Sequence, residues 1–267
     1  MTNPEAPLPT EYLATDHGSR IAYVRTPGKG PELLFCGGFA SDMTGTKATT
    51  LEAHARARGY AFTRFDYSGH GQSSGSFAEG TIGLWKRDAL AVLDQITDGP
   101  VIIIGSSMGG WMALMLAKER PERCAALIGL APAPDFTEDL MWAGFCQEIR
   151  DTLERDRIYR QPSDYSDEPY TITMDLIEDG RNHLVLREPL PLSMPIRLLH
   201  GMRDTDVPVS VSHRIVEHVS SEDVRLTLIK AGDHRLSTDA DLALLLANVD
   251  ELVATVGSES QSDERQS

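Results

Sequence analysis

Cysteines, aromatic residues, basic residues and long apolar runs are all scarce in this chain. Its three cysteines, Cys36, Cys124 and Cys146, are an odd number at no metal-ligand spacing, and each lies in an apolar run. We therefore expect buried thiols in a reducing compartment rather than disulfides or a zinc site. No apolar run approaches the ~18 residues that a membrane-spanning helix needs. Aromatic residues make up only 6% of the chain, within a composition typical of a globular protein.

Positive charge is also in deficit. Lysine and arginine number 25 against 40 aspartates and glutamates, which gives a net charge of −15. Such a surface repels phosphate backbones and anionic lipid, so we expect neither a nucleic-acid partner nor binding to a membrane surface. We expect no membrane span, because no apolar run is long enough. The first residues, MTNPEAPLPTEYL, show neither a basic nor an apolar segment of a signal peptide and no arginine of a transit peptide. We expect a cytoplasmic enzyme, or a mitochondrial matrix enzyme if the chain is eukaryotic and has lost a transit peptide.

Strand-like and helix-like segments alternate along most of the chain. The runs Tyr12–Ala14 and Arg20–Arg25, joined by an Asp/Gly/Ser turn, predict a β-hairpin. Further strands are predicted at Glu32–Cys36, Tyr60–Phe65, Val101–Gly105, Cys124–Ala131, Ile196–His200 and Val224–Lys230, and helices at Lys47–Arg58, Leu84–Ile96, Gly110–Lys118 and Leu242–Val253. This alternation predicts an α/β fold with a mostly parallel central sheet and helices on both faces.

One long segment interrupts the alternation. Residues 135–194 carry many charges, two aromatic clusters and mostly helical or irregular patterning, and prolines mark their end. We expect them to form a helical cap insertion over the carboxyl ends of the strands, where parallel sheets bind ligands. The core is then residues 1–134 and 195–256. Residues 257–267 are polar throughout apart from glycine, and this composition predicts a disordered tail.

The segment Gly105-Ser106-Ser107-Met108-Gly109 has the G-x-S-x-G pattern and stands directly between a predicted buried strand and a predicted helix. A tight strand-to-helix turn leaves no room for side chains at the flanking glycines and lifts the central serine above the sheet edge. Ser107 is therefore the predicted nucleophile, and the N–H of Met108 is a predicted oxyanion-hole donor. Ser106 lies outside the glycine frame. A turn that only packs helix on strand is the structural alternative.

A serine nucleophile needs a histidine base and a carboxylate that orients it. With a serine in a G-x-S-x-G turn, the carboxylate follows the serine along the chain and the histidine comes last. Asp204 follows the predicted strand ending at His200, and Asp206, two residues on, is the fallback for the same role. His234 follows the next strand and is the predicted base. The alternatives are a helix cap or Asx-turn for the aspartate and a solvated surface position for the histidine. His234 must be neutral to accept a proton, so activity should rise with pH.

The loop after Cys36 is glycine-rich, which lets its backbone approach a substrate oxygen. We predict that the N–H of Phe39 is the second oxyanion donor, with a plain glycine turn as the alternative. Residues 66–73, a turn-rich loop at the same sheet edge, are predicted to support the site structurally. In the cap, Met141, Trp142 and Phe145 belong to an apolar set at helical spacing that either lines an acyl pocket or packs the cap onto the core; both can hold.

These motifs resemble the α/β-hydrolase superfamily over nearly the whole chain. The resemblance lies in GGF at 37–39, DYSGHGQS at 66–73, GSSMGG at 105–110, HGMRDTDVP at 200–208 and DHR at 233–235. The strings GSSMGGW, ALIGLA, PIRLLHGMRDTDVP and DHR are similar to the mitochondrial α/β-hydrolase domain-containing acyl-protein thioesterases, also described as acyl-glucuronide esterases. The resemblance implies the triad Ser107, Asp204 and His234, oxyanion N–H groups at Phe39 and Met108, and cofactor-free hydrolysis of thioesters or activated esters. The transit peptide of mitochondrial members is missing.

The predicted function is a serine hydrolase that cleaves carboxylic esters or thioesters through an acyl-enzyme on Ser107. Two alternatives, an aminopeptidase-like enzyme and a carbon–carbon bond hydrolase, would use the same triad. A third alternative is a catalytically inactive binding module that has only the fold. The predicted partner is a small-molecule ester or thioester, with an acylated protein as a further candidate substrate. No cofactor and no metal are expected, because no histidine pair has metal-ligand spacing. The sequence does not indicate an oligomeric state.

Overall fold

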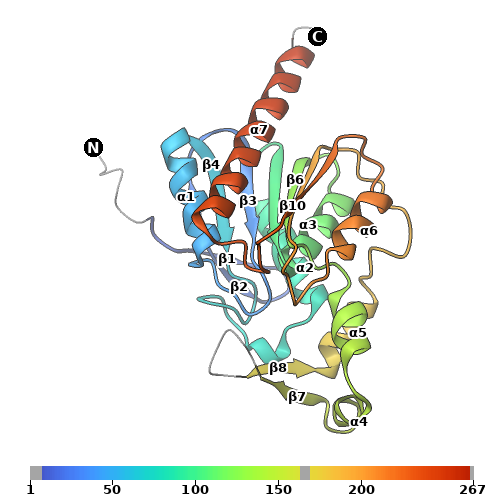
Figure 1. Ribbon diagram of the computed structural model, residues 1–267. Helices are drawn as coiled ribbons and strands as arrows, with labels where there is room; N and C mark the ends of the chain where they lie inside the picture. The colour runs from blue at the N-terminus through green and yellow to red at the C-terminus, as the bar shows by residue number, and fades with distance from the viewer. Residues whose placement is uncertain (1–7, 163–168, 265–267) are drawn as a thin grey trace.

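The computed structural model describes residues 8–162 and 169–264. Its centre is an eight-stranded sheet in the order β1-β2-β4-β3-β5-β6-β9-β10 (Figure 1). The strands are β1 Glu11–Ala14, β2 Arg20–Thr26, β3 Lys29–Cys36, β4 Tyr60–Phe65, β5 Val101–Ser106, β6 Cys124–Leu130, β9 Ile196–Gly201 and β10 Val224–Ile229. The hairpin β1–β2 is antiparallel and joins β4 antiparallel, while every pairing from β4 to β10 is parallel. The predicted α/β fold with a mostly parallel sheet is confirmed.

Helices cover both faces of this sheet. The helices are α1 Thr46–Arg58, α2 Ile82–Gln95, α3 Met108–Glu119, α6 Ser210–His218 and α7 Asp239–Glu264, with a short 3-10 helix, η1, at Phe77–Glu79. One apolar cluster joins the sheet to α2, α3 and α6, and a second cluster joins the opposite face to α1 and α7. Because both faces are covered, β5 begins with four apolar residues in a row, Val101–Ile104, and all six of its residues are buried.

The helix after β5 has no solvated face. Ten consecutive residues of α3, from Met108 to Ala117, are buried, as expected for a helix enclosed by the sheet on one side and other helices on the other. This enclosure fixes the start of α3 rigidly. The turn between β5 and α3 therefore holds its residues in one position at the carboxyl edge of the sheet.

The segment between β6 and β9 forms a separate layer beyond that edge (Figure 1). It contains a π-helix η2 at Thr137–Trp142, helices α4 Gln147–Asp156 and α5 Met174–Arg181, and a two-stranded antiparallel sheet of β7 Ile158–Gln161 and β8 Tyr170–Thr173. Asp135 ties both ends of this insertion together, because its buried carboxylate accepts hydrogen bonds from the N–H groups of Val185 at 2.8 Å and Leu186 at 3.0 Å.

Two predictions about secondary structure differ from the structure. The hairpin β7–β8 was not expected in a segment read as helical or irregular, although its strands IYRQ and YTIT are rich in β-branched and aromatic residues. Helix α7 continues to Glu264, so the predicted disordered tail is wrong for 257–264, whereas 265–267 lie outside the described residues. Once nucleated, a helix gains a hydrogen bond with each added residue, which favours the continuation of α7 beyond the buried Val256.

Cys146 corrects the expectation of three buried thiols. Cys36 and Cys124 are buried, and burial raises the pKa of each thiol to about 12. Cys146 is exposed at the start of α4, a helix in which Leu153 alone is buried. Within the described ranges, none of the helices has the length and apolar character needed to cross a membrane.

Candidate active site

Ser107 occupies the sharp turn between β5 and α3. Its backbone, with φ 54° and ψ −120°, lies in a region that non-glycine residues rarely adopt. The flanking glycines are required by space: a Cβ on Gly105 would lie 2.3 Å from the Gly109 oxygen, and one on Gly109 would lie 2.0 Å from the Cys36 oxygen. The turn thus has the strained geometry that exposes a serine hydroxyl at the end of a strand.

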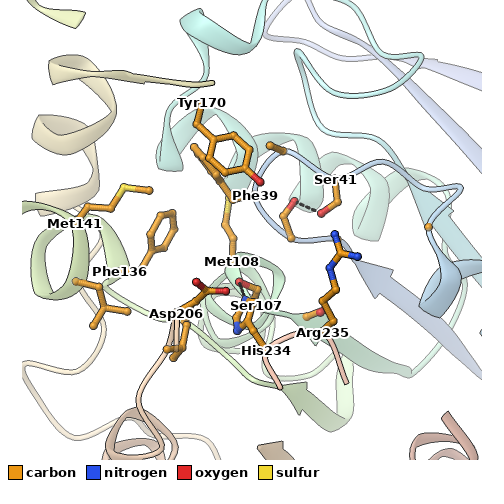
Figure 2. A pocket seen from close by; sticks show the side chains of 18 of the residues that line it. Phe39, Ser41, Ser107, Met108, Phe136, Met141, Tyr170, Asp206, His234 and Arg235 are labelled. Carbon is orange, nitrogen blue, oxygen red and sulfur yellow. Dashed lines mark hydrogen bonds between the residues drawn. The ribbon is translucent and has the colours of Figure 1, made fainter. Parts of the chain in front are cut away.

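His234 bridges Ser107 and Asp204. Its Nε2 lies 3.0 Å from the Ser107 Oγ, and its Nδ1 lies 2.8 Å from the Asp204 Oδ2. The three side chains follow β5, β9 and β10, whose carboxyl ends lie at one edge of the sheet. Figure 2 shows Ser107 and His234 side by side at this edge. Because the carboxylate only accepts hydrogen bonds, Nδ1 carries the proton and Nε2 is left as an acceptor for the serine hydroxyl.

The Asp204 carboxylate is buried and fully hydrogen-bonded. Oδ1 accepts the N–H groups of Asp206 at 2.9 Å and Val207 at 2.8 Å, while Oδ2 faces His234 and, at 3.3 Å, the Nε2 of His200. Burial alone would raise the pKa of this carboxyl. The hydrogen bonds from His200, His234 and Val207 outweigh burial and hold its pKa well below the usual value. Asp204 is therefore a carboxylate throughout the neutral range.

Asp206 lies close by but on the solvent side. It is exposed, and it contributes its backbone N–H, not its carboxylate, to Asp204. One ligand atom from each of Asp204, Asp206 and His234 lies within 4.8 Å of the others, a grouping that a metal ion could use. However, both oxygens of Asp204 already take part in hydrogen bonds, and a metal would have to displace the His234 contact to Ser107 or Asp204. The geometry fits a hydrogen-bonded triad better than a metal centre.

The loop after β3 lies directly against the Ser107 turn. A Cβ built on Gly38 would be 3.5 Å from the Ser107 Cβ, so the chain just before Phe39 packs on the serine. Met108, the first residue of α3, carries one of the N–H groups that an α-helix leaves without an intrahelical partner at its start. Both predicted oxyanion donors thus lie on segments that border Ser107.

A pocket of about 950 Å³ opens over Ser107 and has two unlike sides. Phe136, Met141 and Tyr170 lie on one side in Figure 2, and Ser41 and Arg235 lie on the other. Phe39 stands at the centre of the apolar side, with its ring 4.9 to 5.8 Å from those of Phe77, Trp85, Phe136 and Tyr170. The polar side also contains Lys47, whose pKa is lowered to about 8 by burial and by the nearby Arg235 cation.

The three predicted cap residues divide between two environments. Met141 and Phe145 line the pocket, whereas Trp142 is not among its lining residues. The Trp142 ring instead lies between two guanidinium groups, 5.4 Å from that of Arg150 and 4.9 Å from that of Arg181. The apolar set also packs on a small cap cluster around Leu153. Its members therefore both line the pocket and contribute to the packing of the cap.

Several residues of the site were not singled out by the sequence. His200 was set aside as the end of a strand, although its position four residues before Asp204 places it within reach of that carboxylate. Tyr170 comes from the unexpected hairpin, so no sequence signal placed it at the pocket. Lys47 lies in the first turn of α1, remote in sequence from the triad, and only the tertiary fold brings it to the site.

Residues 31–175 match the alpha/beta hydrolase fold family. The chain belongs to the α/β-hydrolase family. It is 41% identical over 234 residues to a human protein, palmitoyl-protein thioesterase ABHD10, mitochondrial, and the match covers 87% of this chain and 76% of that protein. The corresponding mouse protein is 41% identical over 243 residues, covering 91% of this chain and 82% of its own length.

Solved structures of the family agree with this assignment. Alpha/beta hydrolase domain-containing protein 10 from mouse superposes with a TM-score of 0.86 at 38% identity, covering 93% of this chain and 99% of that one. A structure from Agrobacterium vitis S4 gives a TM-score of 0.88 at 38% identity, covering 93% and 100%. The resemblance predicted from the motifs is confirmed, and this α/β-hydrolase is a serine hydrolase of the esterase or thioesterase type.

Proposed function

We propose that this hydrolase works through an acyl-enzyme on Ser107, with His234 as general base and Asp204 as the acid that orients it. The observation that supports the proposal most directly is the His234 ring, which lies 3.0 Å from Ser107 Oγ and 2.8 Å from Asp204 Oδ2. Nε2 takes the hydroxyl proton as Oγ attacks the substrate carbonyl carbon, and the Asp204 carboxylate stabilises the imidazolium that forms.

The carbonyl oxygen becomes an oxyanion in the tetrahedral intermediate, and the N–H groups of Phe39 and Met108 are the proposed donors to it. The intermediate collapses with cleavage of the bond to the leaving oxygen or sulfur, which takes the proton from Nε2. A water molecule then gives a proton to Nε2 and attacks the acyl carbon. The second collapse frees Ser107 and releases the carboxylic acid.

We further propose a long-chain acyl thioester as the substrate class. Phe136, Met141 and Phe145 give the pocket an apolar side that fits a hydrocarbon chain, and burying each methylene stabilises a bound chain by about 0.8 kcal/mol. Relatives at 41% identity are named palmitoyl-protein thioesterases, which supports an acylated protein as the donor of that chain. Those relatives are named as mitochondrial, whereas a cytoplasmic location stays a prediction for this chain.

The test is hydrolysis of acyl thioesters and p-nitrophenyl esters graded from acetyl to palmitoyl, with Ser107→Ala as the matched control. We expect kcat/KM to rise with chain length and the control to be inactive on every substrate. A maximum at acetyl would contradict the long-chain proposal alone. Cleavage of peptides or of carbon–carbon bonds in preference to every ester and thioester would contradict the proposed reaction as well.

A further inference from the structure

His70 is a buried histidine to which the proposed mechanism gives no role. It lies in the turn-rich loop of residues 66–73, and only 4% of its surface is exposed. Its Nε2 lies 3.2 Å from the backbone N–H of Ala40, and its Nδ1 lies 3.2 Å from the carbonyl oxygen of Ser68. The ring thus connects its own loop to the residue that follows Phe39.

The partners determine the tautomer of this ring. The Ser68 carbonyl can only accept a hydrogen bond, so Nδ1 carries the proton. The Ala40 N–H can only donate, so Nε2 is unprotonated and accepts this hydrogen bond through its lone pair. A protonated Nε2 would face another donor. Burial lowers the pKa of His70 to about 4, in agreement with a neutral ring at physiological pH.

The Ala40 backbone needs this support. Its φ of 54° lies in the left-handed region, which is unfavourable for a non-glycine residue and persists only where neighbours impose it. A second hydrogen bond joins the same two loops three residues on, where the N–H of Met43 donates to the Asp66 carboxylate at 2.7 Å. Both acceptors belong to the loop of residues 66–73, and the hydrogen bond to His70 is the nearer in sequence to Phe39.

We propose that His70 is a positioning residue for the reaction: by accepting the Ala40 N–H, it holds the adjoining Phe39 N–H where the oxyanion develops. The inference rests on the proposed function, because it needs Phe39 to be an oxyanion donor. The packing of the ring supports it. The imidazole lies 5.1 Å from the ring of Phe77 and 5.2 Å from that of Trp85, and both of these also contact the Phe39 ring.

Two substitutions distinguish the effect of losing the hydrogen bond from Ala40 to His70 Nε2 from the effect of losing the packing of the imidazole ring. In His70→Gln the side-chain oxygen can occupy the position of Nε2 and still accept the Ala40 N–H. In His70→Asn the side chain reaches only the position of Nδ1, so the contact with Ala40 is lost. We expect His70→Asn to lower kcat/KM about ten- to a hundredfold, and His70→Gln to stay within about threefold of wild type.

The deciding readout is affinity for a trifluoromethyl ketone, which forms a tetrahedral adduct on the serine and places an oxyanion in the hole. Its inhibition constant should rise in His70→Asn by the same factor as kcat/KM falls, while affinity for the carboxylic acid product stays unchanged. The matched control is His17→Asn. His17 bonds to Asp88, which also accepts the N–H of Ser68, so this change loosens the same loop without touching Ala40.

Equal losses in the Gln and Asn variants, or a ketone affinity that does not follow kcat/KM, would overturn the role of His70. If wild type itself is neither inhibited by the ketone nor active on esters, the proposed function fails instead. A measurement on the wild type covers the case in which a variant does not fold. Nitrogen-15 spectra of the histidine rings should show His70 protonated at Nδ1 alone, and protonation at Nε2 would contradict the proposal.

Discussion

Asp204 and Asp206 show how two residues of the same type, two positions apart, take different places in one loop. The Asp204 side chain is fully buried and receives hydrogen bonds on both oxygens, whereas Asp206 is exposed and lends its backbone N–H to Asp204. The sequence favoured Asp204 but kept Asp206 as a fallback, because chain order and loop position fit both. The tertiary structure distinguishes them, because Asp204 is the carboxylate that lies 2.8 Å from His234 Nδ1.

Asp204→Asn should lower kcat by about 10³ to 10⁴. The amide would donate toward His234 Nδ1 and so favour the tautomer that cannot accept the serine proton. Asp206→Asn, the matched control, should cost about tenfold or less, since the charge that it removes near the imidazolium is exposed and screened by solvent. The measurement is kcat on one activated ester for both variants. Equal losses would show that the two carboxylates share the role.

His70 should make stability depend on pH below neutrality. Its pKa is lowered from 6.5 to about 4, so between these values the unfolded chain binds a proton that the folded chain does not. The free energy of unfolding therefore falls as pH drops through this window, by on the order of 3 kcal/mol in full, and is independent of His70 above pH ~7.

Urea unfolding of wild type and His70→Gln at neutral pH and near pH 4.5 isolates this contribution, because all other groups are common to both proteins. We expect the variant to lose less stability than wild type on acidification. If the two lose the same amount, His70 does not bury a neutral ring.

At the scale of elements, the strands and helices of the sheet layer were predictable and parts of the cap were not. The run Val101–Gly105 is β-branched apart from its last residue and followed by a glycine-framed turn, and these local features suffice to predict β5 and the start of α3. The hairpin β7–β8 consists of two four-residue strands, too short for a periodic signal. Its pairing depends on contacts between segments that the local pattern does not reveal.

Two adjacent residues of the π-helix η2 lie in different environments. Met141 lines the pocket, while Trp142 lies between Arg150 and Arg181 away from it. The sequence placed both residues on one apolar set, because helical spacing alone does not say which of two neighbours faces the substrate. A single-turn π-helix is often found at functional sites, where its extra residue per turn re-aims side chains.

We expect Met141→Trp to shift substrate preference toward short acyl groups, because the larger ring fills space that the hydrocarbon chain needs. The value of kcat/KM should fall at least about tenfold on a palmitoyl ester and little on an acetyl ester, since each excluded methylene forfeits about 0.8 kcal/mol. Trp142→Ala is the control: it should lower the melting temperature without changing the chain-length profile. A shift in that profile for Trp142→Ala would mean that the pocket extends beyond its described lining.

At the scale of the whole molecule, the fold brings three distant loops to one place. Ser107, Asp204 and His234 follow β5, β9 and β10, and the carboxyl ends of these parallel strands meet at a single sheet edge. The order of the motifs predicted this meeting, because the fold it implies fixes which strand ends are neighbours. The contact of His70 with Ala40 was not predictable, since it joins two loops that no periodicity relates.

Peptide mapping after reaction with a fluorophosphonate probe tests the central claim most directly. The probe reacts with a serine activated by a neighbouring base, so the account predicts a single adduct on Ser107. The Ser106→Ala protein should label as wild type does, because Ser106 lies in the same turn with its side chain outside the triad, and the Ser107→Ala protein should not label. An adduct on Ser106, or a Ser107→Ala protein that still hydrolyses esters, would contradict the account.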